Sequence, residues 1–152
     1  MTGYKIRALV MGAASVAGVA IMLYLTVLHY LDSIPVCPAS GIINCEKVLT
    51  SQYSVVPGTS IPISVPGMFW FIVMGIIALS QLTRPSTFVL QTGLIWSIIG
   101  IATVFYLLNV ELNLLNMSIC IWCTAAHFLI VMCLLLSVAQ ITARTEKVEE
   151  ND

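Results

Sequence analysis

The chain has 152 residues, of which 59% are hydrophobic and only 9% are charged. Soluble globular domains carry roughly 25% charged residues, so this composition excludes a water-soluble fold. The formal net charge is -1, and we expect no nucleic-acid partner.

The apolar residues fall into four long blocks. A helix needs roughly 20 apolar residues to cross a bilayer core of about 30 Å, and each block is close to that length. The predicted spans are residues 8–31, 67–83, 87–108 and 117–141. The first block is longer than the roughly 7 to 15 apolar residues of a cleaved signal peptide, so we interpret it as a span. We therefore predict an all-α integral membrane protein, a four-helix bundle in which residues 1–152 form a single domain.

A long segment, residues 32–66, separates the first two spans. It contains Cys37 and Cys45, followed by a stretch at 48–56 that is too short to cross a membrane. We expect a short amphipathic helix in this stretch, lying as a cap across the mouth of the bundle.

Basic residues predict the orientation, because Lys and Arg concentrate in the cytoplasmic segments of membrane proteins. Five of the six lie before the first span, between the second and third, or after the fourth: Lys5, Arg7, Arg84, Arg144 and Lys147. Only Lys47 lies at the opposite end. We therefore expect both termini and the tail 142–152 in the cytoplasm, with 32–66 and 109–116 outside an inner or plasma membrane.

This topology brings two cysteine pairs to one surface. Cys37 and Cys45 lie in the outside segment, and Cys120 and Cys123 open the fourth span, which enters the membrane from the same face. The first turn of a helix favours an anion, and a thiolate is the species that attacks disulfides. Disulfides also persist on the outer side of a membrane. The pattern indicates two redox-active pairs.

Other interpretations of these cysteines stay open from the residues alone. Four thiolates also match a structural zinc site, although an oxidising surface favours disulfides over metal, and we expect no metal. Cys37 and Cys45 alone would suit a static loop disulfide. Cys133 lies deeper in the fourth span among apolar neighbours, so we interpret it as a core residue.

Several spacings occur together in this chain. Seven residues separate Cys37 from Cys45, Ser51 follows six residues after Cys45, Gly67 leads the second span, and the fourth span carries Cys120-Ile121-Trp122-Cys123-Thr124. In this combination the chain resembles the vitamin K epoxide reductase family, most closely its prokaryotic, disulfide-forming type. The likeness covers most of the bundle. One departure is His127, which stands where the animal enzymes have a tyrosine.

The resemblance implies a quinone-dependent thiol–disulfide oxidoreductase. In prokaryotic relatives a quinone, such as menaquinone or ubiquinone, oxidises the enzyme, which in turn oxidises a thioredoxin-fold protein that installs disulfides in exported proteins. Many relatives carry a thioredoxin-like domain fused after the bundle, and this sequence ends before one. We therefore expect a separate thioredoxin-fold partner on the outer side of the membrane.

Exposure predicts the order of electron transfer. A partner thiolate reaches Cys37 in the loop, and the released Cys45 attacks Cys120. Cys123, about 4.5 Å deeper along the helix at 1.5 Å per residue, is then released beside the quinone. By the resemblance Ser51 hydrogen-bonds a quinone oxygen, with a simple turn cap as the alternative. His127, one turn below Cys123, either contacts the quinone or bonds another helix.

Two other functions compete with this interpretation. One is a small four-helix membrane transporter, which usually carries a charged residue inside a span, whereas none of the four predicted spans contains one. The other is a structural tetraspan protein with a static loop disulfide, which would not need a thiol pair at a helix N-terminus.

Overall fold

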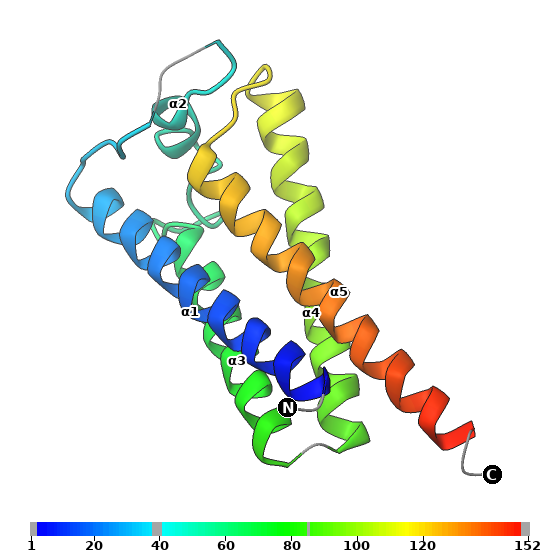
Figure 1. Cartoon of the computed structure of the whole chain (residues 1–152). Coiled ribbons are helices and arrows are strands. Elements are labelled where there is room, and N and C mark those ends of the chain that lie inside the picture. The colour runs from blue at the N-terminus through cyan, green and yellow to red at the C-terminus, as the bar shows by residue number, and fades with distance from the viewer. Residues whose placement is uncertain (1–2, 38–40, 85, 150–152) are drawn as a thin grey trace.

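The computed structural model of the protein describes residues 3–37, 41–84 and 86–149. Within these residues, four helices are long and apolar enough to cross a membrane: α1 (Gly3–Tyr30), α3 (Ser64–Thr83), α4 (Thr87–Asn109) and α5 (Ile121–Glu149). A five-residue helix, α2 (Cys45–Leu49), and a five-residue π-helix, η1 (Val110–Leu114), join the long helices at one end (Figure 1). The prediction of an all-α membrane bundle with four spans and a short capping helix is confirmed.

Small residues let the long helices approach closely. A Cβ atom at Gly18 of α1 would overlap the Phe71 ring on α3, so only glycine fits there. Close backbone approach of this kind is a main source of helix association in membranes, where lipid competes for apolar contact. The Thr26 and Ser64 hydroxyls, 2.8 Å apart, add a polar link between the same two helices.

Two tryptophans join α3 to α4 by a reciprocal pair of hydrogen bonds. Trp70 Nε1 donates to the Trp96 carbonyl at 3.1 Å, and Trp96 Nε1 donates to the Trp70 carbonyl at 3.1 Å. The Trp70 ring lies over Gly100, where an added Cβ would come within 2.6 Å of it. These contacts fix the distance between the two helices beside the site described below.

Polar contacts also join the long helices away from α2. Arg7 Nη1 of α1 donates to the Ala139 carbonyl of α5 at 2.7 Å. The Ser97 and Ser137 hydroxyls join α4 to α5 at 3.2 Å. Cys133 is fully buried in the main apolar core, where the sequence predicted it.

Several helix boundaries differ from the predicted ones. The short helix begins at Cys45 itself, ahead of the predicted stretch 48–56. The fourth long helix begins at Ile121, because residues just before it pair with the cysteine loop. The third long helix continues past residue 108 through η1, which carries Glu111 into the helical segment. Helix α5 also continues into the predicted tail, whose last three residues, 150–152, lie outside the described ranges.

The start of α1, the turn between α3 and α4, and the end of α5 lie together at the end of the bundle opposite α2 (Figure 1). The predicted basic positions therefore lie at one end of the bundle. The four relay cysteines, Cys37, Cys45, Cys120 and Cys123, lie at the other. Which end faces the cytoplasm stays a prediction.

Candidate functional site

A short backbone pairing brings the two cysteine pairs together. The Asn44 N–H donates to the Ile119 carbonyl at 3.0 Å, and the Ile119 N–H donates to the Ile42 carbonyl at 2.9 Å, which forms a parallel bridge between Ile43 and Ile119. Cys120 directly follows one bridged residue, and Cys45 lies two residues after the other. The pairing thus sets the register between segments that lie more than 70 residues apart in the sequence.

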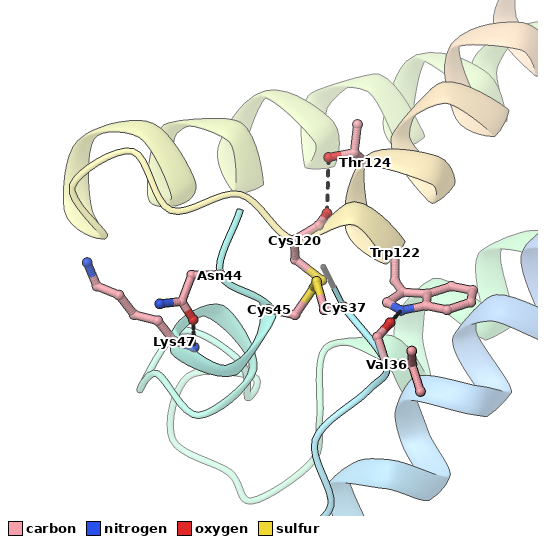
Figure 2. Close-up of a disulfide and its surroundings, with 8 residues drawn as sticks. All are labelled: Val36, Cys37, Asn44, Cys45, Lys47, Cys120, Trp122 and Thr124. Atoms are coloured by element: carbon pink, nitrogen blue, oxygen red, sulfur yellow. Dashed lines mark hydrogen bonds between the residues drawn. A yellow bond between two sulfur atoms is a disulfide. The ribbon is translucent and has the colours of Figure 1, made fainter. Parts of the chain in front are cut away.

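Cys37 and Cys45 form a disulfide, with Cα atoms 6.2 Å apart, while Cys120 and Cys123 are free. Figure 2 shows the Cys120 side chain directed toward this disulfide. Cys45 is 1% exposed and Cys120 is fully buried, whereas Cys37 is partly exposed. All four cysteines belong to one apolar cluster at this end of the bundle, together with Val48, Val110, Leu115, Leu49, Tyr53 and Trp122.

Contacts on both sides of the disulfide hold the loop against α5 (Figure 2). On the Cys37 side, Trp122 Nε1 donates to the Val36 carbonyl at 3.2 Å. On the Cys45 side, the Asn44 side chain caps α2 by accepting from the Lys47 N–H at 2.9 Å. Lys47 Nζ in turn donates to the Leu115 carbonyl at 2.7 Å. The tryptophan of the CxxC motif therefore positions the loop.

Cys120 occupies the position that precedes the first turn of α5. Its carbonyl accepts from the Thr124 N–H at 2.9 Å and from the Thr124 hydroxyl at 3.0 Å, which closes that turn. The Cys123 thiol donates a hydrogen bond to the Cys120 sulfur and thereby lowers the pKa of Cys120. A hydrogen bond to the charged form of a group stabilises that form. Cys120 is therefore the sulfur of the pair that loses its proton more readily.

A cavity of about 830 Å³ adjoins the cysteines and is walled by the four long helices and the loop around α2. Of the two free cysteines near it, Cys123 lines the cavity. Its wall is mostly apolar, with Trp70, Trp96, Ile99, Leu107 and Ile130 among the contributing side chains. A few polar groups in an apolar cavity are typical of a site for a small lipophilic molecule.

Two of those polar groups are the residues that the sequence singled out, Ser51 and His127, which both line the cavity. The Ser51 hydroxyl donates to the Val48 carbonyl at 2.8 Å. Its proton is therefore engaged within the turn, and its oxygen lone pairs stay available to accept a hydrogen bond. His127 is buried, and its Nδ1 has no hydrogen-bond partner among the described residues. The structure brings both residues to the cavity with Cys123. Their roles stay predictions.

Glu111 was not among the site residues predicted from the sequence. The sequence places this residue in an outside segment at 109–116, yet it is 3% exposed and its carboxyl is held by the Cys120 backbone N–H. One sequence signal points to it. The inward-facing residues of α4 alternate by three and four positions, and this register continues to residue 111.

A four-helix membrane bundle in which a disulfide faces a dithiol defines a class, the membrane thiol–disulfide oxidoreductases. The chain belongs to the vitamin K epoxide reductase family, whose sequence model matches residues 9–138. The match reaches into all four long helices and includes Cys37, Cys45, Cys120 and Cys123, so the resemblance to the family is confirmed. The prokaryotic, disulfide-forming type stays a prediction. A comparison with curated proteins gave no significant match.

Proposed function

We propose that the protein passes electrons from a thioredoxin-fold protein, through Cys37/Cys45 and then Cys120/Cys123, to a membrane quinone. By doing so it drives disulfide formation in exported proteins. One observation carries the proposal: Cys120 is directed at the Cys37–Cys45 disulfide, while Cys123 lines the cavity. The two sulfurs of one CxxC motif thus face the two different reactants of a relay.

Burial supports the proposed order of transfer. Cys37 is the more exposed sulfur of its disulfide, so a partner thiolate attacks there and displaces Cys45. In this relay the quinone first oxidises Cys120 and Cys123 to a disulfide. The released Cys45 thiolate then attacks Cys120 of that disulfide and displaces Cys123. Each attack is an ordinary thiol–disulfide exchange, in which one thiolate replaces another on a sulfur atom.

The cavity fits a quinone as electron acceptor. Its apolar walls suit a flat ring, and the imidazole of His127, which lines the cavity, supplies an N–H donor for a carbonyl oxygen. Ser51 lines the same cavity from the loop side. Menaquinone and ubiquinone both have the two carbonyl oxygens that such contacts need, so either can be the electron acceptor in this proposal.

The electron donor in this proposal is a separate thioredoxin-fold thiol oxidase on the outer face of a cell membrane. Cys37 lies next to exposed residues of the loop, such as Val36, which is 85% exposed. An exposed apolar side chain beside the attacked sulfur is suited to contact with such a partner.

The test uses purified protein in detergent, a reduced thioredoxin-fold partner and a water-soluble quinone analogue. We expect the absorbance of the quinone to fall as the partner is oxidised. Replacing Cys123 with alanine abolishes this reaction, whereas Cys133→Ala, a change at a buried cysteine in the core, keeps it and serves as the matched control. Absence of quinone reduction by the folded wild-type protein would instead favour a transporter or a structural tetraspan protein.

A further inference from the structure

The register of α4 determines the burial of Glu111. The buried residues of this helix follow the alternation expected of an inward face: Leu90, Gly93, Ser97, Gly100 and Val104. The next positions in that alternation are Leu107 and Glu111. The carboxyl therefore extends the inner face of the bundle to its cysteine-bearing end.

The surroundings of the Glu111 carboxyl are those of the CxxC pair. The Cys120 backbone N–H donates to it, and a negative charge on it would disfavour a thiolate at either Cys120 or Cys123. Its other oxygen, Oε2, is buried and has no hydrogen-bond partner among the described residues. Lys47, the basic residue of neighbouring α2, donates to the Leu115 carbonyl just beyond η1. A buried carboxylate with an unpartnered oxygen is costly, and uptake of a proton removes the buried charge.

The proposed relay needs such a proton. Oxidation of Cys120 and Cys123 releases two electrons, and a quinone that accepts them also takes up two protons to become a quinol. The hydrogen bond from Cys123 favours the thiolate form of Cys120, and in that form the reduced pair holds one thiol proton, on Cys123. The second proton has to come from another group.

We propose that Glu111 carries this second proton: its carboxylate is protonated when the Cys120–Cys123 disulfide is reduced and gives the proton up when the disulfide re-forms. This inference rests on the proposed function. In the forward step the Cys120–Cys123 bond forms, the pair loses two electrons to the quinone, and one proton leaves Cys123 and one leaves Glu111. The reaction is balanced in charge. The site carries one negative charge before the step, on the Cys120 thiolate, and one after it, on the Glu111 carboxylate.

The test needs no quinone. Purified protein is equilibrated with reduced and oxidised glutathione between pH 6 and pH 8. Alkylation and peptide mass spectrometry then measure the fraction of protein that carries the Cys120–Cys123 disulfide. In the wild type, reduction of the pair takes up as many protons as glutathione releases, so the equilibrium constant does not change with pH. In Glu111→Gln one proton is missing, so the reduced form gains about tenfold per pH unit as the pH rises.

Two further variants sharpen this test. Asn113→Ala alters an exposed residue of the same π-helix and behaves as the wild type. Glu111→Asp keeps a carboxyl and restores a pH-independent equilibrium. With a quinone analogue as acceptor, turnover of Glu111→Gln falls by roughly 100-fold, the size of a typical acid–base contribution.

Two results would overturn the proposal. One is an equilibrium constant that does not change with pH in folded Glu111→Gln. The other is an equilibrium constant of the wild type that changes tenfold per pH unit. This second measurement tests the proposal even if the variant folds poorly. The glutathione measurement also separates this proposal from the proposed function. If it gives the expected dependence while no form of the protein reduces a quinone, Glu111 carries the proton and the electron acceptor is a different molecule.

Discussion

Each of the four relay cysteines has different surroundings, and these determine what its sulfur can attack. Cys37 is partly exposed, Cys45 and Cys120 are buried against each other, and Cys123 lines the cavity. In the reduced dithiol the hydrogen bond from Cys123 makes Cys120 the better nucleophile, since a thiolate and not a thiol attacks disulfides. Cys120 is thus the sulfur that exchanges with Cys45 in either direction of the relay. The reactive sulfur of the dithiol is thus directed at the loop disulfide (Figure 2).

These surroundings predict the intermediate that accumulates in Cys123→Ser. In this variant Cys120 cannot pair with residue 123, so its thiolate attacks Cys45 of the loop disulfide and displaces Cys37, which is the reverse of the relay step. Without the Cys123 sulfur, a mixed disulfide between Cys45 and Cys120 persists because its resolving thiol is missing. We expect non-reducing digestion and mass spectrometry to find these two cysteines linked, with Cys37 free to be alkylated.

Cys120→Ser is the control for this experiment, because it cannot form the link and should show only the Cys37–Cys45 disulfide. A link between Cys37 and Cys120 in Cys123→Ser would reverse the proposed order of the loop cysteines. A variant in which Cys120 stays fully alkylated under all redox conditions would show that the two pairs do not exchange.

At the scale of the elements, apolar block length predicted the four long helices, because a bilayer requires about 20 apolar residues of any spanning helix. The spacing of the cysteines predicted which residues meet. Contacts between distant segments determined the helix ends. Because Ile119 pairs with Ile43, α5 begins only after it, and η1 extends the third long helix far enough to bury Glu111. Block length carries no information on such pairing, so it cannot predict that a charged residue near a span end is buried.

Helix packing gives a prediction that is independent of the redox chemistry. Gly18→Ala on α1 adds a methyl group that overlaps the Phe71 ring of α3, so one of the two helices has to shift. Overpacking of a well-filled core typically costs about 1–3 kcal/mol. We expect a lower melting temperature in detergent and a lower yield of monodisperse protein in size-exclusion chromatography.

Gly12→Ala is the matched control on the same helix. An added Cβ at Gly12 meets the Ala78 Cβ at 3.9 Å, an ordinary contact, so stability should stay close to that of the wild type. Equal melting temperatures for the two variants would mean that α1 and α3 do not pack as closely in detergent as these contacts require.

At the scale of the whole molecule, most basic residues lie at the end of the bundle opposite Cys37, Cys45, Cys120 and Cys123. The start of α1, the α3–α4 turn and the end of α5 gather at one end, and the four relay cysteines with α2 gather at the other (Figure 1). Five of the six basic residues belong to the first end. Because basic residues are retained in the cytoplasm during insertion, this asymmetry predicts the side on which the cysteines act.

We therefore expect the cysteine-bearing end to face outward, where disulfides persist, and the end of α5 to face the cytoplasm. Thr145→Cys, at an exposed position near the end of α5, supplies an inner reporter thiol, and native Cys37 supplies the outer one. Intact spheroplasts are reduced, treated with a membrane-impermeant maleimide and analysed by peptide mapping. Cys37 should be labelled from outside, and the inner reporter thiol only after the membrane is permeabilised, because the label cannot cross a lipid bilayer. Labelling of the inner reporter in intact spheroplasts, with Cys37 protected, would invert the topology and place the relay in the reducing cytoplasm, where a disulfide-forming function is excluded.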